Sequence, residues 1–312
     1  MAGATLGARP PDSRLVGTVA RRRSEALVRL VLATSGLVSI AISVAIVVSL
    51  GYEALLFLSS IDLSQLVAPG WFPRRGMYDL LTLFIGTLMV ASIAMFLAAP
   101  IGLATAIYIS EYASPRTRRT VKPVLEILAG VPSVVLGFFA LTFISPNVVQ
   151  VIFPSAQGFS FMAAALAVGI LTIPLVASIS EDAMRAVPRS LREASYGLGA
   201  RRITTTFRVV MPAAISGIMA ALILAISRTI GETMVVAVAA GATGGSLRTF
   251  NPLGPGQTLT AAMASLATGS DQVTGDSSAY LSLFFLGLLL FAVTLVLNLA
   301  ADVFVRRTRQ KY

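Results

Sequence analysis

The sequence predicts an all-α integral membrane protein with six transmembrane helices. Of its 312 residues, 56% are hydrophobic and 12% are charged, a composition that excludes an ordinary soluble domain. Several stretches without a charge reach the roughly 20 apolar residues that a helix needs to cross a bilayer. Basic residues gather in every second connection between these stretches, which is typical of a chain that crosses a membrane repeatedly.

The first two spans are predicted at 30–52 and 80–110, because neither segment holds a charged residue. The second segment is long enough to cross the membrane with a tilt. We expect a kink at Pro100, since proline removes a backbone donor and clashes with the preceding turn.

The uncharged stretch 127–180 is predicted to hold the third and fourth spans, because it is too long for a single crossing. Polar segments at 145–147 and 154–160 divide it. Further helix kinks are expected at Pro132 and Pro174.

The remaining spans are predicted at 209–240 and 280–301. Six crossings place both ends of the chain on one side, and basic residues mark the cytoplasmic side. Both tails and the connections after the second and fourth spans are strongly basic, whereas the opposite side has only Arg74, Arg75 and Arg248. We therefore predict that both termini are cytoplasmic.

The domain organisation follows from these spans. The predicted parts are a cytoplasmic N-terminal tail (1–26), a first transmembrane helix with an outer loop (27–78), a main transmembrane domain (79–306) with a cytoplasmic loop (185–212), and a cytoplasmic C-terminal tail (307–312). The N-terminal tail is polar and basic, which favours disorder. The first apolar run exceeds the about 7–15 residues of a signal-peptide core, so we interpret it as a signal anchor. Trp71 and Phe72 fit an outer interfacial belt.

Missing residue types exclude several functions. The chain has no cysteine and no histidine, so it can form neither a disulfide nor a thiolate or imidazole metal site. Its lysines, Lys122 and Lys311, lie outside any Gly-rich loop, so there is no Walker A phosphate cradle. We therefore predict no enzyme activity, no metal and no cofactor in this chain. The basic residues behind the net charge of +10 gather on one side of the predicted membrane. This distribution indicates contact with lipid and not with nucleic acid.

The loop 185–212 has helix signals of its own. Ser190 and Glu193 have the spacing of a capping box, in which each side chain bonds the other residue's backbone amide. Gly197 and Gly199 can adopt positive φ at low cost, so the short helix should end there. The loop is predicted to form a short helix, a glycine bend and a longer helix that enters the fifth span.

The same loop resembles the cytoplasmic coupling loop of bacterial ABC importer permeases. The family pattern is Glu-Ala-Ala, three residues, Gly, nine residues, Ile, one residue, Leu-Pro. The matching positions are Glu193, Ala194, Gly199 and Pro212, with Ser195, Val209 and Met211 as conservative departures. The resemblance implies that the short helix seats in a groove of a separate ATPase and transmits its motion to the fifth span.

Arg228 and Glu232 interrupt the fifth span, and their spacing of four places them on one face of a helix. Ionisable side chains inside a span are costly and usually face a partner or an aqueous path. A guanidinium suits an oxyanion because its fork donates two parallel hydrogen bonds. Glu232 could accept a hydrogen bond from a protonated anion, with Thr229 and Thr233 beside it. The alternative to a pathway role is a buried ion pair that fixes helix packing, or a contact with a partner subunit.

Three further runs narrow the resemblance to the phosphate-specific transporter permeases. They are Ile-Ser-Glu-Tyr-Ala at 109–113, Ala-Gly-Val-Pro-Ser-Val-Val at 129–135 and Arg-x-x-Gly-Glu-Thr at 228–233. The run Gly-Glu-Thr-Met-Val-Val-Ala at 231–237, with Asn-Pro-Leu at 251–253 and Thr-Leu-Thr at 258–260, resembles the PstC-type subunit more than its PstA-type partner. Leu136 departs from the family, since many relatives have tyrosine there.

The resemblance implies a type I ABC importer permease (MetI-like) fold in the bacterial cytoplasmic (inner) membrane. Such a chain forms half of an alternating-access path in an ATP-driven, binding-protein-dependent phosphate importer. Its implied partners are a second PstA-type permease, two PstB-type ATPase subunits that bind ATP and Mg²⁺, and an extracytoplasmic PstS-type phosphate-binding protein. On this basis the pathway residues for phosphate are Arg228, Thr229, Glu232 and Thr233.

Other functions stay open at this point. An importer for sulfate or molybdate would share the coupling loop, so 228–233 is the segment that discriminates among anions. A channel or ion-coupled secondary carrier would need no docking loop and should show inverted repeats with broken helices. An intramembrane enzyme is disfavoured because the chain lacks histidine, cysteine and clustered carboxylates.

Overall fold

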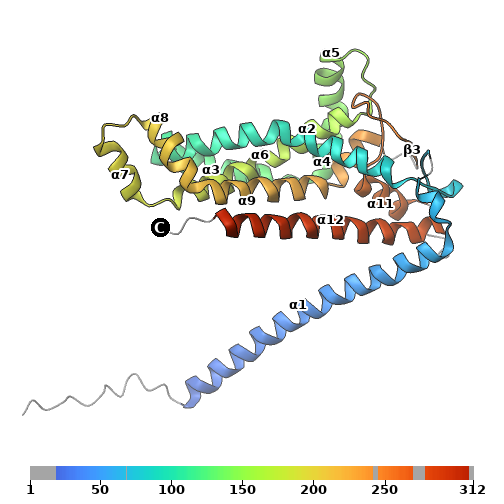
Figure 1. Cartoon of the computed structure of the whole chain (residues 1–312), viewed down its shortest axis with the longest axis horizontal. Helices are drawn as coiled ribbons and strands as arrows, with labels where there is room; N and C mark the ends of the chain where they lie inside the picture. The colour runs from blue at the N-terminus through green and yellow to red at the C-terminus, as the bar shows by residue number, and fades with distance from the viewer. Residues whose placement is uncertain (1–18, 68, 242–244, 270–277, 309–312) are drawn as a thin grey trace, which may run out of the picture. The chain divides into compact units, whose positions relative to one another are not determined.

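The computed structural model describes residues 19–67, 69–241, 245–269 and 278–308. Contacts between residues divide the chain into two units, Met1–Leu50 and Gly51–Tyr312. Helices account for most of the described residues (Figure 1).

The first unit contains most of helix α1, which spans Val19–Ser60. The disorder expected in the N-terminal tail is wrong for 19–26, because this segment already belongs to the helix; the first 18 residues lie outside the described part of the chain. Alanine, arginine and glutamate make up six of the eight residues at 19–26, and all three are good helix formers, so the helix extends beyond the apolar run.

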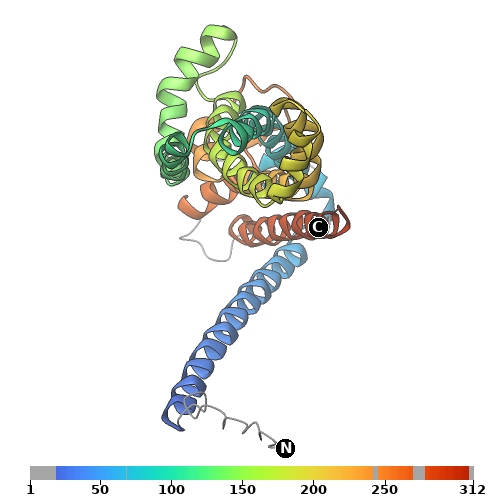
Figure 2. The same ribbon diagram turned by 90° about the vertical axis from the view of Figure 1, so that its left-hand side faces the viewer.

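Four long helices build the second unit: α2 (Leu80–Ile107), α6 (Phe161–Arg185), α9 (Met211–Ile230) and α12 (Ser278–Thr308). They run side by side, with α6 packed against α2 and α9, and α12 along α9 (Figures 1 and 2).

Small residues allow α2 and α6 to approach closely. A Cβ on Gly102 would lie 2.7 Å from the Cβ of Val176, so that position has no room for a side chain.

Shorter helices complete the unit. They are α3 (Pro115–Ala129), α4 (Ser133–Phe139), α5 (Gln150–Ile152), α7 (Arg189–Gly197), α8 (Arg202–Thr205), α10 (Met234–Val236) and α11 (Leu259–Thr268). Four π-helical segments join them to their neighbours: η4 (Tyr108–Tyr112), η5 (Ala140–Val149), η6 (Thr206–Val210) and η7 (Ala237–Gly241).

Six helical segments of the described chain are long and apolar enough to cross a membrane, which confirms the predicted spans. They are Glu25–Ser60, Leu80–Tyr112, Ser133–Ile152, Phe161–Arg185, Arg202–Ile230 and Ser278–Arg307. The third segment begins at Ser133, later than the apolar sequence predicts. The fifth ends at Ile230, earlier than the apolar sequence predicts. Non-helical turns at 130–132 and 231–233 account for both differences.

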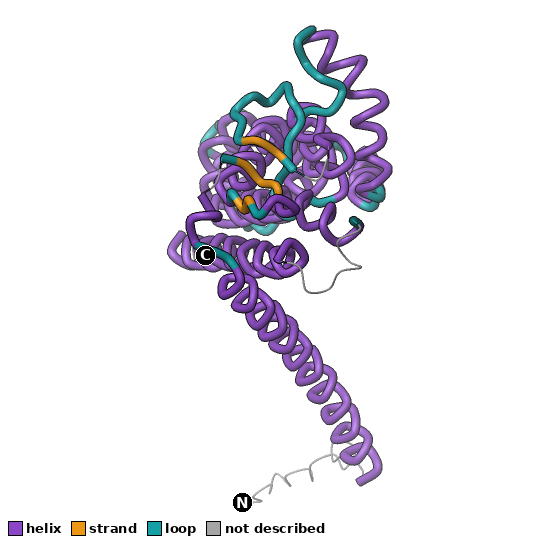
Figure 3. The backbone as a smooth tube through the Cα atoms, turned by 90° about the vertical axis from the view of Figure 1, so that its right-hand side faces the viewer, coloured by secondary structure: helices purple, strands orange, loops and turns teal. Residues whose placement is uncertain are grey.

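A small sheet lies at the end of the second unit away from α7 (Figures 1 and 3). Its strands are β1 (Gly70–Phe72), β2 (Met77–Tyr78) and β3 (Ser246–Leu247), antiparallel in the order β2-β1-β3. The 3₁₀ turns η2 (Leu63–Val67) and η3 (Pro73–Arg75) flank the first strand. Strands of two or three residues show no alternating pattern, so sequence periodicity could not predict them.

Trp71 is 1% exposed and packs edge-on against Tyr78, with ring centroids 5.9 Å apart. The prediction that it belongs to an interfacial belt is therefore wrong, because the strand pairing turns its ring into a core that includes Phe57 and Leu286.

The three prolines behave differently. Pro100 and Pro174 lie inside α2 and α6, which continue through them. Pro132 lies outside a helix, at the N-cap of α4, and therefore separates α3 from α4 instead of kinking one helix. Its missing N–H costs nothing at that position, because a helix start leaves such groups unpaired.

Candidate functional site

The short helix of the loop, α7, begins earlier than predicted. Its N-cap is Pro188, with φ −54° and ψ 139°, and no side chain caps it. Ser190 therefore lies inside the first turn, and the predicted capping box between Ser190 and Glu193 is wrong. The proline sets the extended conformation from which the helix starts, two residues before the serine.

The bend after α7 forms at the predicted glycine. Gly199 has φ +79°, in the left-handed region that favours glycine. The turn is closed by the Leu198 amide, which donates to the Ala194 carbonyl at 3.2 Å, and by the Ala200 amide, which donates to Ser195 at 3.1 Å. No atom lies within 4 Å of a Cβ built on Gly199, so the requirement is conformational and does not come from crowding.

The motif residues of α7 lie mainly at its surface. Glu193 and Ala194 are exposed, and Leu198 is 90% exposed beside Tyr196 at 43%. Ser195 is half-buried, with its hydroxyl 2.9 Å from that of Thr205 in α8. The other motif positions begin α9, with Met211 half-buried and Pro212 exposed.

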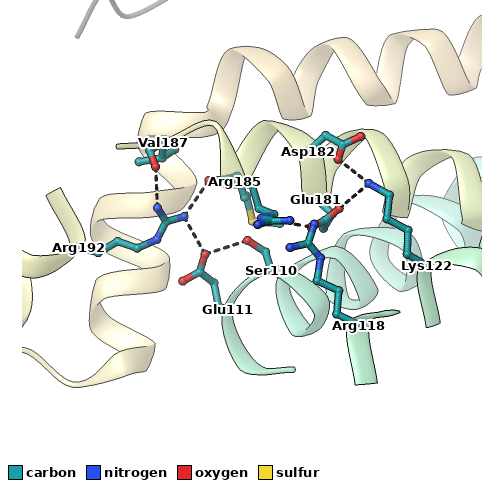
Figure 4. A network of polar contacts seen from close by, with 10 residues as sticks. Ser110, Glu111, Arg118, Lys122, Glu181, Asp182, Arg185, Val187 and Arg192 are labelled. Carbon is teal, nitrogen blue, oxygen red and sulfur yellow. Dashed lines mark hydrogen bonds and ion pairs between the residues drawn. The ribbon is translucent and has the colours of Figure 1, made fainter. Parts of the chain in front are cut away.

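A polar network that sequence reasoning missed fastens α7 to the helices around it (Figure 4). Arg192 donates to the carbonyls of Val187 and Met184 at 2.7 and 2.8 Å, and to Glu111 at 3.1 Å. Ser110 donates to the same Glu111 oxygen at 2.9 Å. The Glu111 side chain is 4% exposed, so its charge is balanced inside the protein.

A second group of charges surrounds Glu181 near the end of α6, whose side chain is 1% exposed. Arg118 of α3 lies 2.6 Å from it, Lys122 3.1 Å and Arg185 4.0 Å (Figure 4). Lys122 also donates to Asp182 at 2.7 Å, and this hydrogen bond raises the pKa of the lysine above its ordinary value. The sequence signal was the presence of carboxylates at the ends of two apolar spans, Glu111 after the second and Glu181 with Asp182 in the fourth, each beside a basic connection.

The intramembrane segment departs from the prediction. Helix α9 ends at Ile230, and 231–233 are non-helical before α10. Arg228 is exposed in the last turn, whereas the partly buried Glu232 lies beyond it. They therefore do not share a helical face, and no ion pair joins them among the described residues. The Glu232 carbonyl accepts a hydrogen bond from Thr260 at 2.7 Å, a contact outside the helix that replaces the regular helical one.

The two threonines occupy different environments. Thr229 is 3% exposed, donates to the Ala225 carbonyl at 2.8 Å and lies 3.5 Å from the hydroxyl of Thr172 in α6. Thr233 is partly exposed and donates to the Gly231 carbonyl at 3.1 Å. Arg228, Glu232 and Thr233 are therefore accessible, whereas the Thr229 side chain is buried where α9 packs against α6.

Comparison with known families identifies the fold and the class of protein. Residues 98–310 match the family described as "Binding-protein-dependent transport system inner membrane component". The chain belongs to this family. It is therefore a multi-pass inner-membrane component of a transport system, as its six apolar helices also indicate.

Individual relatives confirm the resemblance to phosphate-transport permeases of the PstC type. The "Probable ABC transporter permease protein YqgH" of Bacillus subtilis is 36% identical over 228 residues, covering 72% of this chain and 74% of the relative. The "Phosphate transport system permease protein PstC 1" of Mycobacterium tuberculosis is 33% identical over 255 residues, covering 75% and 74%. Its counterpart "PstA 1" is 40% identical over 158 residues, about half of each chain.

Solved structures share the fold. A bacterial ABC transporter for the import of alginate matches with a TM-score of 0.63 at 15% identity, covering 93% of this chain and 98% of the other. The inward-facing MetNI methionine ABC transporter matches with a TM-score of 0.52 at 20% identity, covering 74% and 94%. The type I, MetI-like permease fold is thereby confirmed.

Proposed function

We propose that this chain is the transmembrane permease subunit of an ATP-driven, binding-protein-dependent importer of inorganic phosphate. It forms half of the translocation path, and a PstA-type permease forms the other half. Two PstB-type ATPase subunits bind ATP and Mg²⁺, and a PstS-type extracytoplasmic protein delivers phosphate. The chain itself catalyses no reaction.

The observation that carries this proposal is the exposed face of α7. A short helix that carries the exposed Tyr196 and is capped by the almost fully exposed Leu198 suits a groove on a partner protein. The bend at Gly199 returns the chain directly to α9. Closure of the ATPase pair on ATP would push α7 and turn the path between the permeases outward, which is alternating access.

The substrate assignment rests on the break after α9. Arg228 presents an exposed guanidinium within an apolar span, a costly arrangement that suits an aqueous path. Its fork can donate two hydrogen bonds to one phosphate, and Glu232 can accept one from a protonated phosphate oxygen. Thr233 adds a hydroxyl. Thr229 is left out of the pathway, because its side chain is buried between α6 and α9.

The proposed topology places α7 and both termini in the cytoplasm. Helix α12 ends on the side of the second unit where α7 lies (Figure 1). Its last turn carries Arg306 and Arg307, and α3 and α7 carry further basic residues at that end. This agrees with the excess of positive charge on the cytoplasmic side of membrane proteins.

Phosphate uptake at low external concentration tests the function. The complete transporter would be compared with an Arg228→Gln variant and with an Arg306→Gln control, which removes an exposed arginine far along α12. Losing a charged hydrogen-bond donor should lower uptake by about tenfold or more, with normal amounts of protein in the membrane. The control should transport normally.

Competition distinguishes phosphate from other oxyanions. Excess unlabelled phosphate should abolish the uptake of radiolabelled phosphate, whereas excess sulfate or molybdate should leave that uptake unchanged. Unchanged uptake in Arg228→Gln would contradict the pathway role, and unchanged uptake after deletion of the whole chain would contradict the phosphate assignment.

A further inference from the structure

One guanidinium joins three segments at the base of α7. Arg192, in the helix itself, donates to the carbonyl of Met184 in the last turn of α6, to that of Val187 in the turn between α6 and α7, and to the carboxylate of Glu111 in η4, directly after α2. These partners come from positions up to 81 residues away in the sequence. Movement of α7 away from either span would break charge-assisted hydrogen bonds (Figure 4).

The burial of this link makes it stiff. The Arg192 side chain is 17% exposed and that of Glu111 is 4% exposed, so water cannot readily replace either partner. Separating a buried pair leaves an uncompensated charge, which is far more costly than separating a surface pair. The three acceptors also lie in different directions, so the guanidinium holds its position against both a pull and a tilt.

A second link lies beside the first. Arg118 and Lys122 of α3 bind Glu181 of α6, and α3 directly follows η4 along the chain. The segment from α2 to α3 and the segment from α6 to α7 are therefore joined at two charged positions. Such a doubly fastened pair should move as one body.

The polar connection from α7 toward α9 is weaker. Its described side-chain hydrogen bond joins the neutral hydroxyls of Ser195 and Thr205, and Leu191 adds an apolar contact with the cluster that includes Val210 and Ala214. Bonds with a charged partner are roughly twice as strong as such neutral ones. The bend at Gly199 lies between the two helices, and its backbone is exposed.

We infer that Arg192 and Glu111 are positioning residues that pass the displacement of α7 to α2 and α6, the second and fourth spans. This differs from the expectation that the motion passes chiefly to the fifth span. The inference rests on the proposed function, in which an ATPase displaces α7.

The test is a double-mutant cycle in the complete transporter with its ATPase, second permease and binding protein. The variants are Glu111→Gln, Arg192→Gln and the combination of both. Each single variant should keep the ATPase subunits bound and hydrolysing ATP while phosphate transported per ATP falls by about tenfold, a coupling loss of ordinary size between distant sites. The double variant should be no worse than the worse single one, because both remove the same link.

Two further variants sharpen the test. Asp302→Asn removes a carboxylate from the exposed Asp302–Arg306 pair of α12 and should leave the ratio unchanged. Arg192→Lys keeps the charge beside Glu111 but loses the fork, so it should assemble normally and lower the ratio severalfold. If the glutamine variants are depleted from the membrane, Arg192→Lys takes their place in the measurement.

The outcomes separate the two ideas. A wild-type complex without ATP-dependent phosphate uptake would overturn the proposed function. Normal uptake per ATP in the variants of a working wild type, strictly additive losses, or loss of bound ATPase in every variant would overturn the positioning role alone.

Discussion

Asp79, directly after β2, and Arg248, directly after β3, form an ion pair, with 2.8 Å between the Arg248 Nη2 and Asp79 Oδ2 atoms. Asp79 is fully buried and also caps α2, since its Oδ1 accepts from the Leu81 amide at 3.1 Å. Thr82 donates to its other oxygen at 2.6 Å. One carboxylate thus joins the start of the second span to the chain that follows β3.

Replacing Asp79 with asparagine should destabilise the protein by about 2 kcal/mol. The loss is smaller than for a fully buried pair, because the Arg248 side chain is 34% exposed. Thermal unfolding of the purified protein in detergent would measure it, with Asp302→Asn as the exposed control. Equal unfolding temperatures for the two variants would contradict this account.

Replacing Gly199 with valine should uncouple transport. A β-branched residue at φ +79° costs on the order of 1–3 kcal/mol, so the bend would change shape even though space is available. Uptake should fall while the protein stays in the membrane. Gly197→Ala is the matched control, because Gly197 ends a regular helix, and normal uptake in Gly199→Val would refute the prediction.

Thr229 and Glu232 should respond differently to substitution. Thr229→Val keeps the shape of the buried side chain and loses a hydroxyl whose shortest hydrogen bond is to the Ala225 carbonyl of its own helix, so phosphate uptake should stay within about twofold of wild type. Glu232→Gln removes the acceptor charge from the accessible break and should lower uptake. If the Thr229 variant lost uptake at normal membrane levels, the exclusion of Thr229 from the pathway would be wrong.

The protein should become less stable as the pH rises into the alkaline range, because Lys122 loses its proton there. The hydrogen bond to Asp182 raises the pKa of Lys122 above its ordinary 10.5, so the folded state holds this proton more tightly than the unfolded state does. Its contribution is fully present below pH 10.5 and is lost as the pH rises through the folded-state pKa.

Unfolding temperatures from pH 7 to 11 in detergent would measure this loss, and Lys122→Met should remove it. Burial also raises the pKa of Tyr78 above its ordinary 10.0, which adds a loss of the same sign. A Tyr78→Phe background therefore isolates the lysine. An identical alkaline slope with and without Lys122 would contradict the prediction.

Local features of the chain were predictable because their causes are local. Apolar runs of sufficient length identified six spans, and the spacing from Glu193 to Pro212 identified the loop family. Gly199 was recognised as the bend because positive φ is a property of the residue type. The start of α7 was predicted two residues too late. Pro188 and Ser190 are both acceptable as the N-cap of a helix, and the sequence does not show which of them takes that position.

The sequence by itself thus determined the membrane class, the spans and the glycine bend of the loop between the fourth and fifth spans. Only the tertiary structure decided which charges meet, as Glu111 with Arg192 and Asp79 with Arg248 do across 81 and 169 positions. It also ended α9 before Glu232, where Thr260 supplies a hydrogen bond from another helix. Periodicity and residue preference act over a few neighbours, whereas a buried charge or a broken helix is settled by whatever partner the packing brings to it.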